Sequence, residues 1–230
     1  MKYSAIILAA GSGLRTGLNT NKILIQINGR CVVDYSIKFF EKDDNCSEVI
    51  LVVSKRNFQA LDEMYSSEFI KVIIGGLHRQ DSVYNALKIA TNDYVLVHDG
   101  ARPFILKDYV DDIVHNLEEY SSITLGVKVK ETIQEVDGNR VVRTLDRNSL
   151  IITQTPQGFK KDILIKAHQL AFDDTYFGTD DTVLIERYLG ITAFVVEGDY
   201  RNVKLTTIDD IDLLEVILKW ELERAQTSIV

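Results

Sequence analysis

The chain has 230 residues, of which 46% are hydrophobic, and a formal net charge of −8 from 34 acidic and 26 basic residues. This length suffices for one well-buried domain and only marginally for two. The acidic balance argues against non-specific binding to nucleic acid or to an anionic membrane surface. No apolar run approaches the ~20 residues that span a bilayer, so we expect no nucleic-acid partner and no membrane partner.

The compartment is predicted from the cysteines and the N-terminus. Cys31 and Cys46 are the only two cysteines, too few for a disulfide framework, and they fit a reducing environment. The first residues contain one lysine and then a strand-like stretch, without a cleavage-like site. We therefore expect a cytoplasmic protein.

Buried strand patterns alternate with helical patterns through the first half of the chain. Strands are expected at 3–8, 49–53, 69–74, 94–97 and 123–129, and helices at 33–40, 57–64, 81–90 and 109–117. This alternation predicts an α/β fold with one doubly wound, mostly parallel sheet and helices on both faces. Ligands of such sheets bind at the carboxyl ends of the strands.

The pattern changes near residue 127. Two β-rich runs flank Asp137-Gly138, a strong hairpin signal, and together they predict a protruding arm at about 127–146. A two-stranded ribbon alone is marginal in water, so the arm should lie on its parent domain or on a partner subunit. The remaining expected elements are helices at 160–172, from about 178 and at 208–223, and strands at 191–196 and 202–205. We expect residues 1–230 to form one domain.

The loop after the first strand combines glycines with cations. Gly11, Gly13 and Gly17 fall within seven residues, and Arg15 and Lys22 accompany them. Glycines let backbone N–H groups approach an anion closely, and the two cations can neutralise phosphate oxygens. The loop therefore predicts a polyphosphate site.

Three other interpretations of this loop compete with a polyphosphate site. Its spacing, G-x-G-x-x-x-G, departs from the dinucleotide fingerprint, and no acidic residue is placed for a ribose. The G-x-x-x-x-G-K-[ST] phosphate loop is absent. The remaining alternative is a turn whose cations are merely solvated.

A second candidate stretch runs from Val97 to Phe104. Asp99 just past a strand end, with Arg102 three residues on, can hold a metal or a sugar hydroxyl beside a phosphate clamp. The alternative is a local ion pair closing a turn. His98 is predicted to pack in the interior, and no His/Cys cluster has the ligand spacing of a zinc site.

Several further residues lie where a ligand could bind. Gly76, His78, Arg79 and Ser82 open a predicted helix, whose N-terminal N–H groups suit an anion or a base edge. Lys204 lies in a short apolar strand and must point into a polar cleft or toward a partner. Arg147 lies at the base of the hairpin, and Thr179 most simply belongs to a helix cap.

These stretches occur together in a specific order along the chain. They are Leu8–Arg15, Gly75-Gly76 with Arg79–Val83, Val97–Phe104, Asp146-Arg147, Gln154–Gln157, Gly178–Asp180 and Asn202–Thr207. In this order, from Ala5 to about Leu218, the chain resembles the 2-C-methyl-D-erythritol 4-phosphate cytidylyltransferases of the non-mevalonate isoprenoid pathway. The resemblance implies a Rossmann-like nucleotidyltransferase fold and a reaction of CTP with a polyol phosphate that yields CDP-methylerythritol and pyrophosphate.

The resemblance also implies roles for individual residues. Those that would neutralise the triphosphate and the transition state are Arg15, Lys22 and Lys204. Those that would contact CTP are Ala9, Ala10, Gly11, Gly13, Gly76 and Ser82. Those that would hold the acceptor are Asp99, Arg102, Thr132, Arg147, Thr155 and Thr179. Mg²⁺ would bridge the phosphates, with Asp99 a candidate to contact it, and the arms of a homodimer would carry Thr132 and Arg147 into the neighbouring pocket.

Some positions depart from this pattern and leave alternatives open. Leu77 stands where a polar or acidic residue is usual, which bears on base selectivity. D-ribitol-5-phosphate cytidylyltransferase shares the fold and the use of CTP, although Ala101 and Asp146 favour the methylerythritol phosphate enzyme over it. A non-catalytic nucleotide sensor on the same fold is the alternative from another class.

Overall fold

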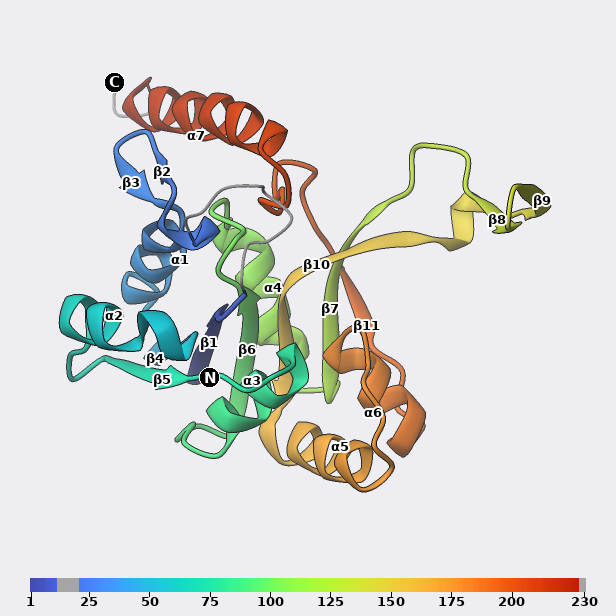
Figure 1. Ribbon diagram of the computed structural model, residues 1–230, viewed down its shortest axis with the longest axis horizontal. Coiled ribbons are helices and arrows are strands. Elements are labelled where there is room, and N and C mark those ends of the chain that lie inside the picture. The colour runs from blue at the N-terminus through green and yellow to red at the C-terminus, as the bar shows by residue number, and fades with distance from the viewer. Residues whose placement is uncertain (12–20, 228–230) are drawn as a thin grey trace.

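The structure is a computed structural model that describes residues 1–11 and 21–227. Its centre is a seven-stranded sheet in the order β11-β7-β10-β6-β1-β4-β5 (Figure 1). All neighbouring strands are parallel except where β10 pairs with β6 and β7. The strands are β1 (Tyr3–Ala9), β4 (Cys46–Val53), β5 (Ile70–Ile74), β6 (Tyr94–Asp99), β7 (Ser122–Lys128), β10 (Ile151–Lys160) and β11 (Phe194–Glu197).

Helices cover both faces of this sheet, which confirms the predicted fold class. Alternate strand side chains point to opposite faces; Ile7 packs into the core beneath one set of helices and Ile6 into the core beneath the other. The first set is α1 (Val32–Glu41), α2 (Phe58–Tyr65) and α4 (Lys107–Asn116). The second set is α3 (Arg79–Leu87), α5 (Lys161–Asp173) and α6 (Asp181–Leu189). Because strands buried on both faces read as continuous apolar runs, the sequence revealed them clearly.

The order of the strands reverses beside β1. The chain runs from β1 outward to β4 and β5, and then returns to place β6 on the other side of β1. Ligands of such sheets bind at the carboxyl ends of the strands, at the point where the strand order reverses.

A third, smaller core lies near the carboxyl end of β6. Helix α7 (Asp209–Thr227) packs Leu214 and Leu218 with Ile27, Phe104 and Leu205. The short elements of this part of the chain are η2 (Lys22–Leu24), β2 (Gln26–Ile27) and β3 (Arg30–Cys31), and η3 (Lys55–Asn57) precedes α2. Within the two ranges that the structure describes, no helix has the length and apolar character needed to cross a bilayer.

The predicted hairpin arm is present. Strands β8 (Gln134–Asp137) and β9 (Arg140–Thr144) pair antiparallel, with Gly138 in the turn at a φ of 57°. Figure 1 shows the arm extending away from the sheet beyond β7 and β10. Every residue of the two strands is exposed, and η4 (Arg147–Ser149) leads back toward the body.

Two features of the second half differ from the prediction. Strand β10 was not predicted, because its polar centre and Pro156 do not resemble a central strand; its register with β7 shifts between Gln154 and Gly158, around that proline. The strand predicted at 202–205 is wrong. This segment has no regular structure, and Leu205 is buried there because it packs with α7.

Candidate active site

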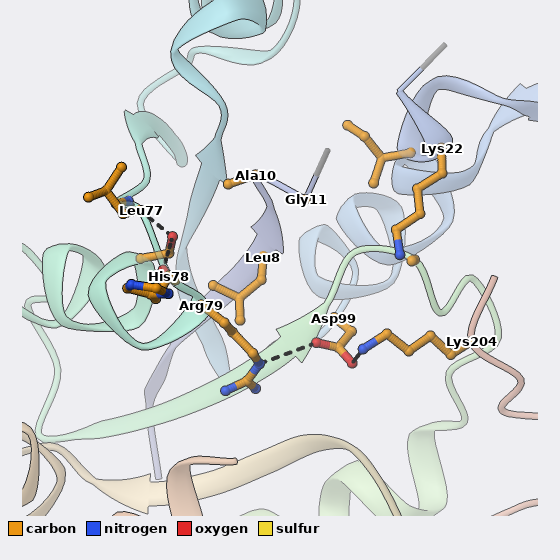
Figure 2. A pocket seen from close by; sticks show the side chains of 13 residues that line it. Leu8, Ala10, Gly11, Lys22, Leu77, His78, Arg79, Asp99 and Lys204 are labelled. Carbon is orange, nitrogen blue, oxygen red and sulfur yellow. Dashed lines mark hydrogen bonds and ion pairs between the residues drawn. The ribbon is translucent and has the colours of Figure 1, made fainter. Parts of the chain in front are cut away.

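A pocket of about 400 Å³ opens at the carboxyl ends of β1, β5 and β6, at the point where the strand order reverses (Figure 2). Gly11, Gly76 and Asp99, each at or just after the end of one of these strands, meet in this pocket. The lining residues are Leu8, Ala10, Gly11, Lys22, Ile23, Gly76, Leu77, His78, Arg79, Ser82, Asp99, Ala101 and Lys204.

One wall of the pocket, which we call the backbone side, consists of Ala10, Gly11, Gly75, Gly76 and Ser82. A Cβ on Gly75 would lie 2.9 Å from the Cβ of Ala10, and one on Gly76 would lie 2.1 Å from the Cβ of Asp81. Only glycine fits at either position. The Ser82 hydroxyl accepts a hydrogen bond from Gly76 N at 3.1 Å and donates one to His78 O at 3.1 Å, which fixes the turn before α3.

The start of α3 is held by a second local contact. Asp81 accepts a hydrogen bond from the backbone N–H of His78 at 2.9 Å, as a capping carboxylate does. The helix therefore begins at Arg79, two residues before the predicted start. This brings Arg79 into the wall of the pocket.

The opposite wall, the charged side, centres on Asp99 at the end of β6. Lys204 Nζ lies 2.7 Å from Asp99 Oδ2, Arg102 Nε lies 3.6 Å from the same oxygen, and Arg79 Nε lies 3.7 Å from Oδ1. Burial alone would raise the pKa of Asp99, but the charges of Lys204 and Arg79 outweigh it and hold that pKa below its usual range. Asp99 is therefore an ionised carboxylate surrounded by cations.

Arg102 both closes the turn after β6 and joins the charged side. Its backbone N–H donates to Asp99 O at 2.9 Å, and its guanidinium donates to Asn202 O at 2.6 Å. Burial lowers the pKa of Arg102, which the negative charge of Asp99 partly offsets. The local ion pair between Arg102 and Asp99 is thus present, and it places Arg102 beside a residue that lines the pocket.

His98 supports the charged side from behind. It is fully buried, with Nε2 3.0 Å from Arg102 O and Nδ1 3.2 Å from Thr155 Oγ1. Desolvation lowers the pKa of His98 to about 4, so the ring is neutral near pH 7. Thr155 also accepts a hydrogen bond from Asp99 N at 3.0 Å. The prediction that His98 packs in the interior is confirmed, and Thr155 lies behind the pocket wall.

Lys22 approaches the pocket from η2. Asn21 caps this turn by accepting a hydrogen bond from Ile23 N at 3.4 Å, and Figure 2 shows the Lys22 side chain extending toward Asp99 and Lys204. Ala9 is buried at the end of β1, directly before the lining residue Ala10. Gly13 and Arg15 lie outside the described residues.

Ala9, Arg102 and Thr155 adjoin lining residues without lining the pocket themselves, and three more predicted residues do not line it either. Thr179 is exposed just before α6. Thr132 and Arg147 are exposed at the base of the arm, where the Arg147 guanidinium donates to Lys130 O at 2.8 Å.

The sequence places Arg79 among the residues that open a predicted helix but predicts no role for its side chain, although that side chain lines the pocket. Its partner Asp181 lies far along the chain, so no local pattern indicates the contact. Leu77, which the sequence singled out, is 96% exposed at the mouth of the pocket. Beside it the rings of His78 and Phe177 are 4.1 Å apart, and the sequence did not predict this contact.

The pocket fits a divalent cation that arrives with phosphates. Among the residues that the structure describes there is no group of three or more His, Cys, Asp or Glu side chains able to hold a metal. Asp99 is the only carboxylate among the pocket-lining residues. Mg²⁺ keeps several water ligands and binds through one or two carboxylates plus substrate phosphates, so one carboxylate is an adequate protein contribution.

Fold and pocket together define an α/β protein whose site can take a phosphorylated ligand at the strand ends. The family model for IspD, 2-C-methyl-D-erythritol 4-phosphate cytidylyltransferase, matches residues 3–220, and the chain belongs to this family.

Individual relatives agree with the family match. The chain is 40% identical over 226 residues to the 2-C-methyl-D-erythritol 4-phosphate cytidylyltransferase of Bacillus velezensis, with 96% of this chain and 97% of that protein covered. It is 41% identical over 221 residues to the enzyme of the same name from Bacillus mycoides, covering 94% and 97%. The crystal structure of 4-diphosphocytidyl-2C-methyl-D-erythritol synthase from Anaerococcus prevotii superposes with a TM-score of 0.83 at 28% identity, covering 95% and 98%.

Proposed function

We propose that the protein transfers CMP from CTP to 2-C-methyl-D-erythritol 4-phosphate and releases pyrophosphate, a step of the non-mevalonate isoprenoid pathway. The observation that carries the proposal is one pocket in which a glycine-built wall faces a wall of cations around Asp99. Family membership over residues 3–220 supports the same reaction. Because the family is one of cytidylyltransferases, we favour an enzyme over a non-catalytic nucleotide sensor.

The two walls suit the two substrates. We assign CTP to the backbone side, where Gly76 and Ser82 hold a turn that no larger residue could form. We assign the polyol phosphate to the charged side, beside Asp99 and Lys204. A phosphate oxygen of the acceptor attacks the α-phosphorus of CTP, and the bond from that phosphorus to the bridging oxygen breaks as pyrophosphate leaves.

The protein's main contribution is positioning and neutralisation of negative charge. Lys22 and Lys204 point into the pocket from different segments (Figure 2), so two cations can contact the phosphates around the reacting phosphorus. Arg15, outside the described residues, would add a third. Mg²⁺ would arrive with the triphosphate and supply further neutralisation, with Asp99 the one lining carboxylate able to contact it.

The arm is the basis for a proposed homodimer. Its two strands are fully exposed, and Ile133, Val136, Val141 and Val142 present apolar side chains to solvent. Such a ribbon is stabilised when it packs on another surface. In a dimer Thr132 and Arg147 of one subunit would complete the acceptor pocket of the other.

Sedimentation velocity tests the dimer. We expect the wild type to sediment as a dimer and a variant lacking residues 133–142 to sediment largely as a monomer. An undiminished dimer in the shortened protein would exclude the arm as the interface.

We place the reaction in the cytoplasm. Both cysteines, Cys31 and Cys46, are free thiols, which supports a reducing compartment.

Pyrophosphate release from CTP and Mg²⁺ tests the proposed reaction. The assay is run in parallel with 2-C-methyl-D-erythritol 4-phosphate and with D-ribitol 5-phosphate, and each is repeated with ATP, GTP and UTP because Leu77 lies at the pocket mouth. We expect release with CTP and the first acceptor. Release with ribitol phosphate alone would keep the nucleotide assignment and overturn the acceptor, and silence with both would overturn the function.

A further inference from the structure

A series of contacting polar side chains crosses the interior beside the pocket. His168 Nε2 lies 3.0 Å from Asp181 Oδ1, and the guanidinium of Arg79 contacts Asp181 Oδ2. Arg79 Nε then lies 3.7 Å from Asp99 Oδ1, and Asp99 Oδ2 lies 2.7 Å from Lys204 Nζ. These residues come from five segments of the chain: α5, α6, α3, β6 and the coil that contains Lys204.

The two oxygens of Asp99 face different kinds of cation. Figure 2 shows Asp99 between Arg79 and Lys204. Arg79 is fixed, because its guanidinium is also held by Asp181, whose side chain is fully buried at the start of α6. The two side chains are about equally exposed, at 32% for Arg79 and 35% for Lys204, but Lys204 sits on a segment without regular structure. One cation is therefore anchored from behind, and the other can move.

A phosphate entering the pocket changes the balance around Asp99. Lys204 cannot direct its charge fully at both the phosphate and Asp99. If it turned to the phosphate, Asp99 Oδ2 would keep only the more distant Arg102 Nε at 3.6 Å, and without Arg79 no cation would face Oδ1. A carboxylate with only 12% of its side chain exposed would then be poorly neutralised, which is unfavourable for a buried charge. A second cation that stays on Asp99 removes this penalty.

We propose that Arg79 is a positioning residue, a fixed counter-cation for Asp99 that releases Lys204 to the substrate phosphates. Arg79 cannot follow the phosphate itself without breaking its contact with Asp181. Its part in the reaction is therefore exerted through Asp99 and Lys204. This inference rests on the proposed function, because it assigns Lys204 to phosphate in the reacting complex.

The test is steady-state kinetics of Arg79→Gln with CTP and the polyol phosphate. Without Arg79, Asp99 retains Lys204, so we expect kcat to fall ~100-fold while the KM for CTP changes less than ~3-fold. Arg79→Lys retains the charge but lacks the fork that reaches two carboxylates, and it should recover about tenfold of the loss. In an Asp99→Asn background, where nothing competes for Lys204, the added Arg79→Gln change should cost less than ~3-fold.

Two further variants separate this role from folding. Arg79→Gln leaves Asp181 buried without its cation, so Arg79→Gln/Asp181→Asn is made as well, and it should show the same loss of kcat. Lys71→Gln is the matched control: Lys71 Nζ lies 2.6 Å from the buried carboxylate of Glu48, near the other end of the sheet. It should lower thermal stability and leave kcat within ~2-fold.

The outcomes distinguish this inference from the proposed function. A wild type that is inactive with both acceptors would overturn the function and the inference together. An active wild type whose Arg79→Gln variant retains kcat within ~3-fold would overturn the inference alone. So would a rise in the KM for CTP as large as the fall in kcat, since Arg79 would then act by contacting CTP.

Discussion

The two walls of the pocket are built in different ways. The backbone side is largely local: Gly75, Gly76 and Ser82 lie within eight residues, and Ala10 and Gly11 join them from the end of β1. Its contacts are steric limits and backbone hydrogen bonds. The charged side is assembled from distant segments, with Lys204 reaching Asp99 across 105 positions. A local wall sets the shape of a ligand, and an assembled wall sets where charge is concentrated. Substitutions on the charged side should therefore lower kcat, and substitutions on the backbone side should weaken the binding of CTP.

The largest effect is expected on the charged side. Lys204→Ala removes a cation 2.7 Å from Asp99 Oδ2, and we expect kcat to fall ~10³-fold, about 4 kcal/mol, with little change in the affinity for CTP. Calorimetric titration with CTP and initial-rate kinetics measure the two quantities. Lys107→Ala, which breaks ion pairs with Asp111 and with the buried Asp43, is the control and should leave kcat unchanged, because none of these residues lines the pocket. An equal loss of CTP affinity and kcat in Lys204→Ala would erase the distinction between the walls.

The next effect tests whether the charged side needs a neutral support. His98 is protonated in the unfolded chain below about pH 6.5, whereas burial lowers the pKa of the native residue to about 4. Between these values the unfolded state binds one more proton, so stability falls as the pH falls, by about 3 kcal/mol in total. His98→Gln should flatten this dependence in urea unfolding from pH 7 to 4. A variant that is destabilised equally at every pH would show that His98 does not titrate in this way.

The same contrast explains what the sequence could predict. β1 and β4 were predictable because strands buried on both faces are continuous apolar runs. The glycine turn at 75–76 was visible because no other residue fits there. These features depend on neighbouring residues. From them the sequence predicted the parallel strands of the sheet, its helices and the position of the pocket.

What the sequence could not reveal depends on distant partners. β10 is central although its middle is polar, because Gln157 donates to Thr124 Oγ1 at 3.0 Å and to Asp180 Oδ2 at 2.7 Å. The segment at 202–205 alternates like a strand, yet its apolar residue Leu205 packs with α7. Arg79 has no local sign of its role, because Asp99 and Asp181 reach it only in the folded chain.

The smallest of these effects is expected on the backbone side. Gly76→Ala places a Cβ 2.1 Å from the Cβ of Asp81, which α3 holds in place, so the turn must shift. Overpacking of this kind costs about 2 kcal/mol, and we expect CTP to bind ~30-fold more weakly while kcat at saturating CTP changes little. Isothermal titration with CTP measures the first quantity and initial rates the second.

The matched control for Gly76→Ala is Gly190→Ala. Gly190 ends α6 at a φ of 67° with nothing within 4 Å of an added Cβ, so its substitution strains the backbone by about 1 kcal/mol without touching the pocket. It should lower thermal stability and leave CTP binding intact. If Gly76→Ala instead lowered kcat and spared CTP affinity, the backbone side would share in the chemistry, and the division between a wall that shapes and a wall that neutralises would have to be abandoned.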